Sequence, residues 1–289
     1  MKRKIMTPKS NAKALNNLTY TDYYYRLMLM ACSVFKWEGL PENLSEKWIE
    51  KYLFNDGECM LFHDNTLGYM VTQATAQHLN AYDEPINLRP VATNYTNTKT
   101  YTNGVDAVLI CNNDLRLPTR HTVELFSMRL ADITRAIDVN ITMQKTSALI
   151  ICSEKQRLSL KHAYQQWDAN EPVIYGDKSM GSEPITSIKT DAPIVFDKLQ
   201  LQKHALLNEL YTFLGVNNAN QDKKERLVTD EVSANDEQVV MHAQMMLKAR
   251  QEAAKQINKI FALNVSVSLR SESLKEVMKD SEPSEPKEV

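Results

Sequence analysis

Three basic side chains in one polar stretch have the clearest capacity to bind a charged ligand. Lys223, Lys224 and Arg226 stand together, interrupted only by Glu225. Cations grouped in this way contact phosphate groups, but similar runs also occur routinely on the solvated faces of surface helices. Spacing alone therefore leaves phosphate contact and a plain solvated surface equally open.

Acidic side chains follow this cluster in two adjacent pairs, Asp230 with Glu231 and Asp236 with Glu237. Paired carboxylates hold divalent metal ions in nucleases. Adjacent acids in a loop are more often solvated turn residues or helix N-caps. A metal-dependent nuclease is thus the enzymatic alternative, and the solvated interpretation is favoured.

Other catalytic, metal and cofactor patterns are missing from the sequence. The six histidines include no H-x-x-x-H pair, and no G-x-S-x-G nucleophile motif occurs. The chain has 7 glycines among 289 residues and contains neither G-x-G-x-x-G nor G-x-x-x-x-G-K-[ST], the loops that hold phosphates against the backbone. We therefore predict no catalytic residue, no metal ligand and no cofactor.

Charge and cysteine usage narrow the class of protein further. The 34 basic and 36 acidic side chains give a formal net charge of -2, so any DNA contact is expected to be local or loose, because tight wrapping neutralises many phosphates. The four cysteines lie far apart without a C-x-x-C motif, which favours reduced thiols. No apolar run is long enough to span a bilayer, and the basic segment 1–13 lacks the apolar core of a signal peptide, so we expect neither a membrane span nor secretion.

The pattern of apolar residues predicts an α+β fold that is mainly helical. In the first part of the chain, helices are expected at 16–31 and 46–54, and strands at 60–76 and 105–111. The intervening residues 80–103 are rich in Asn, Thr, Tyr and Pro, which is typical of a long polar loop.

Two long amphipathic helices are expected to bracket a small α/β insert. Pro118 begins the first, with apolar residues at steps of three and four as far as Ile141. The second runs from about Val195 to Leu214 and ends before Gly215, which stands where a C-terminal cap belongs. The remaining expected elements are insert strands at 148–152 and 172–175, an insert helix at 158–167, a polar loop at 216–237, a helix at 237–263, a strand at 264–270, and mobile tails at 1–13 and over the last 15 residues.

Several strings of the sequence follow one another in a specific order. They are FKWEGLP (35–41), LICNND (109–114), PTRHTVELF (118–126), QKTSALI (144–150), LSLKHAYQQW (158–167), PVIYG (172–176), KTDAP (189–193), DKLQLQK (197–203) and TFLGVNNANQDKKERLVTDEVSANDEQ (212–238). Together they resemble the portal proteins of small short-tailed bacteriophages, also called upper collar or head-tail connector proteins. The resemblance covers nearly the whole chain except the two tails and residues 80–103.

This resemblance implies a ring of twelve identical subunits at one capsid vertex. Viral DNA would be packaged and ejected through its central channel, and the ring would join head to tail. The implied parts are an N-terminal arm and first wing segment (1–117), a first stem helix (118–146), a clip insert (147–192), a second stem helix (193–215), a channel loop (216–237), a second wing segment (238–270) and a disordered tail (271–289).

The resemblance also assigns roles to five basic residues. Lys189 and Lys198 match channel-facing lysines of the family, and we expect them to slow or steady exiting DNA. Lys223, Lys224 and Arg226 lie in the matching channel loop, which is expected to grip packaged DNA against leakage.

The partners implied by the resemblance are double-stranded viral DNA bound without sequence specificity, the major capsid and scaffolding proteins, the lower collar and tail proteins, and a packaging ATPase, with a packaging RNA as a further candidate. ATP hydrolysis would belong to that separate motor, so the chain itself is expected not to be an enzyme. It would reside in the virion after assembly in the cytoplasm of the host bacterium. The alternatives are a metal-dependent phage nuclease or packaging enzyme that uses the loop acids described above, and a monomeric adaptor that binds a ring made by another protein.

Overall fold

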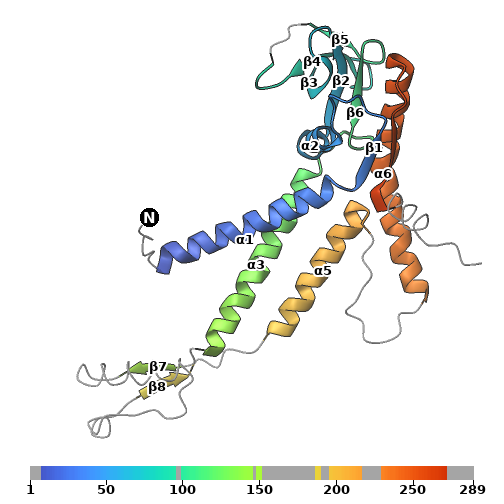
Figure 1. Ribbon diagram of the computed structural model, residues 1–289. Coiled ribbons are helices and arrows are strands. Elements are labelled where there is room, and N and C mark those ends of the chain that lie inside the picture. The colour runs from blue at the N-terminus through green and yellow to red at the C-terminus, as the bar shows by residue number, and fades with distance from the viewer. Residues whose placement is uncertain are drawn as a thin grey trace, which may run out of the picture. The chain divides into compact units, whose positions relative to one another are not determined.

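The computed structural model describes residues 8–95, 99–145, 148–151, 186–189, 195–216 and 229–271. Contacts divide the chain into two compact units, Met1–Ile133 with Gln202–Val289, and Thr134–Leu201. The described elements mix long helices with antiparallel strands (Figure 1), which confirms the expected α+β class.

Two helices lie in the N-terminal part of the larger unit. α1 covers Pro8–Ala31 and α2 covers Glu46–Asp56. The sequence predicted a mobile tail as far as residue 13, and this boundary is wrong because the helix already begins at Pro8. Proline suits the first helical position, where its fixed φ fits and its missing N–H has no intrahelical partner to lose.

A five-stranded antiparallel sheet follows, with the order β5-β4-β3-β2-β6. Its strands are β2 (Glu58–Asp64), β3 (Gly68–Leu79), β4 (Pro85–Val91), β5 (Tyr101–Thr102) and β6 (Ala107–Cys111). The polar loop predicted at 80–103 therefore contains two strands. Leu88 and Tyr101 are buried against Met60 and Phe62 of β2, so a small apolar face holds β4 and β5 in place despite the turn-like composition of the segment.

Three long helices carry the rest of the larger unit. α3 covers Arg120–Lys145, α5 covers Phe196–Leu214 and α6 covers Thr229–Phe261. Two of them, α3 and α5, extend into the smaller unit. The first two agree with the periodicity, and Gly215 follows α5 with a φ of 72° as a C-terminal cap requires.

The start of α6 departs from expectation. The polar segment 216–237 was predicted to be a loop, but α6 begins at Thr229 and includes the rest of that segment. Its composition is compatible with a helix because acidic residues near a helix N-terminus are favoured by the peptide dipoles.

Short strands complete the structure. In the larger unit β1 (Phe35–Glu38) pairs antiparallel with β9 (Ser266–Leu269), close to the predicted closing strand. In the smaller unit β7 (Ala148–Ile151) pairs antiparallel with β8 (Thr186–Lys189). The insert helix expected at 158–167 and the strand expected at 172–175 lie outside the described residues.

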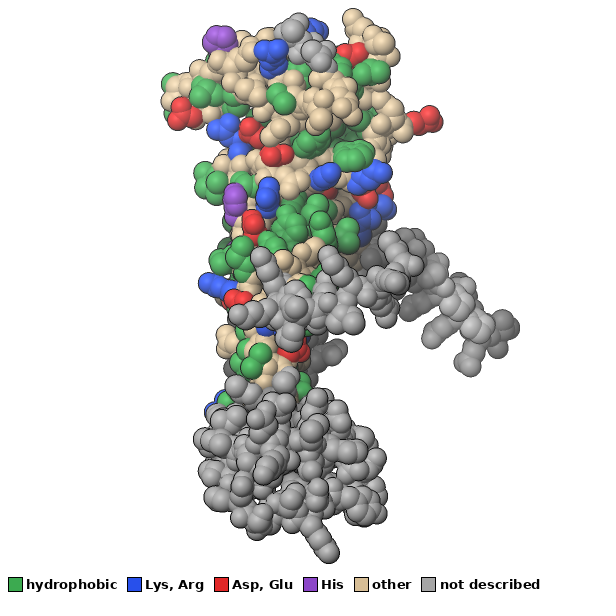
Figure 2. Space-filling model, turned by 90° about the vertical axis from the view of Figure 1, so that its left-hand side faces the viewer, with side chains coloured by type: hydrophobic (Ala, Val, Ile, Leu, Met, Phe, Trp, Pro, Cys, Tyr) green, Lys and Arg blue, Asp and Glu red, His purple; other side chains and the backbone are tan. Residues whose placement is uncertain are grey.

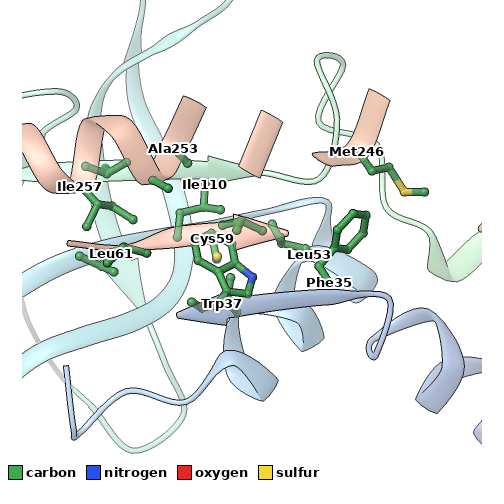
Figure 3. Packing of buried hydrophobic residues seen from close by; sticks show 14 residues of the cluster. Phe35, Trp37, Leu53, Cys59, Leu61, Ile110, Met246, Ala253 and Ile257 are labelled. Atoms are coloured by element: carbon green, nitrogen blue, oxygen red, sulfur yellow. The ribbon is translucent and has the colours of Figure 1, made fainter. Parts of the chain in front are cut away.

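The larger unit has two main apolar clusters. One gathers side chains of β1, α2, β2, β6, α6 and β9, with Trp37, Cys59 and Ile110 meeting beneath Ala253 and Ile257 of α6 (Figure 3). The other is made where α1 crosses α3 and α5, and it contains Tyr23, Leu27, Phe54, Val123, Phe126, Leu130, Ala131, Leu206, Leu210 and Leu214. These clusters fix the start of α3 and the end of α5 against the body of the unit.

Candidate functional site

Lys198 lies in the first turn of α5, directly after Asp197. Its side chain is exposed. Among the residues that the structure describes, none forms a hydrogen bond or ion pair with its ammonium group. An exposed ammonium group can attract a phosphate, but the attraction is weak because water and salt screen it.

Lys189 is the last residue of β8 and stands opposite Ala148 of β7. It therefore ends a two-stranded ribbon in the unit Thr134–Leu201, the unit that also contains Lys198. The Lys189 side chain and all atoms of Lys223, Lys224 and Arg226 lie outside the described residues, so their role in binding DNA stays a prediction.

Most other cations on α3 and α5 in the larger unit are already engaged within the chain. The Arg120 guanidinium lies 3.9 Å from the Glu124 carboxylate, and Arg129 lies over the Phe126 ring at 5.7 Å. Lys203 lies 5.7 Å from the centre of the Tyr23 ring of α1. These contacts hold the cations near their own protomer, which weakens their pull on a polyanion.

The acids considered for metal binding give no metal centre in the described part of the chain. Asp230, Glu231 and Asp236 follow the backbone of the first turns of α6. Within the ranges whose side chains are described, no group of three or more His, Cys, Asp or Glu residues could hold an ion. The arrangement that a two-metal nuclease requires is therefore not seen there.

A buried ionic network, which sequence reasoning missed, joins α6 to the body. The Arg250 guanidinium donates to both carboxylate oxygens of Glu50, at 2.9 and 2.8 Å, and to the carbonyl and side-chain oxygens of Asn112, each at 3.0 Å. Trp37 Nε1 donates to Glu50 at 2.8 Å, and the Phe35 ring lies under the guanidinium at 4.0 Å. Nearly every donor and acceptor is satisfied, as a buried charge pair requires.

One signal in the sequence could have revealed this network. Arg250 occupies a place in the apolar stripe of α6 between Met246, Ala253 and Ile257, at steps of four, three and four. A charge at such a position is buried if the helix packs, and it then needs a partner of opposite charge. The partner itself could not be named, because Glu50 is one of many acids.

The described cysteines are protected by burial. Burial raises the pKa of the Cys32 thiol to about 12 and that of Cys111 to about 11. The pKa of the fully buried Cys59 is raised well above its usual value for the same reason. These thiols stay protonated at neutral pH and have little nucleophilic character.

No helix in the described ranges is both long enough and apolar enough to cross a membrane.

The chain is similar to known proteins over nearly its full length. A family model described as Phage Connector (GP10) matches residues 3–274. A chain of the structure described as the portal and tail of native bacteriophage P68 superposes with a TM-score of 0.52 at 13% identity, covering 97% of this chain and 98% of that chain. A portal protein of the HK97 phage family from Corynebacterium diphtheriae gives a TM-score of 0.45 at 12% identity, covering 94% and 98% of the two chains. The likeness to the P68 chain shows a shared fold.

Proposed function

The chain belongs to the phage connector family and is a head-tail portal protein of the virion, and we propose that twelve copies form the ring through which viral DNA is packaged and ejected. The observation that carries this proposal is the family match over residues 3–274, which includes every described helix and strand. The alternatives of a nuclease and a monomeric adaptor have no comparable support.

We assign α3 and α5 to the stem that lines the channel, the insert 147–192 to the clip, and the sheet with β1, β9 and α6 to the wing. The segment 216–237 would hang into the channel, with its last part continuing into α6 from Thr229. The continuous amphipathic helices α3 and α5 support this assignment, because such helices can pack between subunits while a polar face meets hydrated DNA.

Weak contact with DNA is central to the proposed mechanism. A channel that lets a polyanion pass in both directions cannot contain deep positive wells, because these would hold the DNA in place. A formal net charge of -2 and the engaged cations Arg120, Arg129 and Lys203 fit this requirement. Lys189 and Lys198 would then brake exiting DNA, and Lys223, Lys224 and Arg226 would retain packaged DNA.

The proposed partners are the capsid and scaffolding proteins at the outside of the ring, the lower collar and tail proteins at one end, and a packaging ATPase, with or without a packaging RNA, at the clip. ATP hydrolysis would lie with that motor, and this chain would act without catalysis or cofactor. Assembly in the cytoplasm of the host bacterium is part of the same proposal.

Electron microscopy and native mass spectrometry of the purified chain test the architecture. Closed rings with a central hole are expected, and a stable monomer would contradict the proposal.

Charge reversal tests the role of the channel loop. The triple variant Lys223→Glu, Lys224→Glu, Arg226→Glu should form rings and package DNA, but filled heads should lose their DNA. Lys255→Glu is a matched control, since Lys255 is an exposed lysine on α6 that lies outside the loop. Normal DNA retention in heads with the triple variant would contradict the loop's role.

A further inference from the structure

The outward face of α1 carries large apolar side chains that are exposed among the residues that the structure describes. Leu15, Leu18, Tyr25 and Leu29 are 47%, 64%, 58% and 69% exposed. They follow one another at helical spacing, with Asp22 filling the one remaining place in the stripe. We call these four apolar residues the α1 stripe.

The opposite face of α1 is buried in the chain's own core. Tyr23 and Leu27 pack with Val123 of α3 and Leu210 of α5. Between Ala14 and Ala31 the only charged side chains are Asp22 and Arg26, and they pair with each other at 2.6 Å. A helix segment that has large apolar side chains on both faces is normally buried on both.

A second uncovered apolar surface lies on α6. A groove of about 480 Å³ runs between the loop before α3, the end of α5 and α6. Leu115, Leu117 and Met245 line it and are 76%, 57% and 51% exposed, and Phe213 and Met246 contribute to its wall. We call this the α6 groove.

The buried face of α1 and the α6 groove border the same short part of α3 and α5. The buried face of α1 touches Val123 and Leu214, whereas the α6 groove is lined by Thr122 and Phe213, the adjacent residues. α1 and α6 lie on either side of the end of α5 (Figure 1). The side from which α1 projects carries hydrophobic patches between charged side chains (Figure 2).

We propose that the α1 stripe of one subunit packs into the α6 groove of the next subunit of the ring. This inference rests on the proposed function, because a ring needs two different, complementary surfaces on each subunit.

The chemistry of both surfaces favours a second copy of this chain as the occupant. The acidic side chains that the structure describes at both surfaces are paired: Asp22 pairs with Arg26 on one, and Asp114 at the groove lies 3.9 Å from the Lys248 ammonium on the other. The α1 stripe consists of Leu and Tyr, and the groove offers Leu, Met and Phe side chains beside its polar ones, which are residue types found in the cores of permanent subunit interfaces. An amphipathic helix lying in an apolar groove is also a common mode of recognition.

Cysteine cross-linking of the full-length protein tests the contact. The panel pairs Leu18→Cys, Tyr25→Cys or Leu29→Cys with Leu115→Cys or Met245→Cys in the same chain. At least one pair should give a ladder of covalent oligomers on oxidation. Each single variant alone should give no more cross-linking than the wild type, and a mixture of two matching single variants should stop at covalent dimers, because the contact joins unlike surfaces.

Leu18→Glu supplies a second readout. This exposed position should accept Glu without loss of the fold, so circular dichroism should be unchanged while native mass spectrometry shows a shift from rings to monomers. Leu67→Glu is the matched control, since Leu67 is 55% exposed in the turn between β2 and β3, and it should keep the rings.

Two results would overturn the inference while leaving the proposed function intact: wild-type rings in which no pair of the panel cross-links, or α1 single variants that cross-link with themselves. A wild-type chain that stays monomeric would overturn both the inference and the proposed function.

Discussion

The Arg250 guanidinium and the Glu50 carboxylate, 200 positions apart in sequence, form a two-point ion pair in which each side chain is only 2% exposed. The pair also hydrogen-bonds to Asn112, in the loop after β6, and to Trp37, in strand β1. This arrangement fixes the middle of α6 to α2. Helix α6 is thereby anchored to the body of the larger unit.

Removing one partner of this pair should be strongly destabilising. Arg250→Met leaves the Glu50 charge buried without compensation, and we expect a loss of about 3–5 kcal/mol in the free energy of unfolding. Urea denaturation at constant protein concentration measures it. Arg120→Met is the matched control, because the Arg120 pair with Glu124 is half-exposed and should contribute below about 1 kcal/mol. Similar losses of unfolding free energy in the two variants would show that the buried pair contributes no more than the exposed one.

Gly215 should not tolerate a side chain. Its φ is 72°, and an added Cβ would lie 2.5 Å from the Cβ of Ala243 on α6. Gly215→Ala therefore combines the left-handed backbone cost of about 1–2 kcal/mol with an overpacking cost of about 1–3 kcal/mol. Gly104 has a φ of 82° with nothing within 4 Å of an added Cβ, so Gly104→Ala isolates the backbone cost. Thermal unfolding of the two variants should differ, and equal losses would contradict the close contact of α5 with α6.

Asp64 should make stability depend on pH in the acid range. The Tyr95 hydroxyl donates to its carboxylate at 2.6 Å, and this hydrogen bond, with those from the Thr66 and Leu67 amides, lowers the pKa of Asp64. A group whose pKa is lowered by folding stabilises the protein above its unfolded pKa of about 3.9, and this stabilisation is lost as pH falls through the lower folded value.

Comparison with Asp64→Asn measures this effect. The wild type should have the higher melting temperature at pH 7, and the difference should shrink steadily below about pH 4. A difference that is the same at pH 7 and pH 3 would show that the carboxylate charge is not involved.

Cys32, Cys59 and Cys111 should react slowly with thiol reagents in the folded protein. Because burial raises the pKa of each thiol, to about 12 for Cys32 and about 11 for Cys111, very little thiolate is present at pH 8. In a Cys152→Ser background, colour release from an aromatic disulfide reagent should be slow until denaturant is added. Rapid reaction of the folded variant would contradict this burial.

The local periodicity of apolar residues was sufficient to predict the long helices α3 and α5. The signals for α3 and α5 are local: an apolar stripe in each, a proline before α3 and a glycine after α5. Because each signal depends only on residues nearby in the chain, the observed helices Arg120–Lys145 and Phe196–Leu214 are close to those predicted. The order of family-like strings likewise depended on the sequence alone, and the family match over residues 3–274 agrees with it.

Only the tertiary structure decided features that depend on residues far apart in the chain. β4 and β5 are strands because the apolar face of β2 accepts Leu88 and Tyr101, although their own segment has the composition of a loop. Arg250 becomes a buried anchor only because Glu50 meets it across α2 and α6. The α6 groove and the α1 stripe likewise arise from helix packing. Sequence patterns record which faces are apolar, but which faces meet, and which stay uncovered for a partner, is set by the three-dimensional packing.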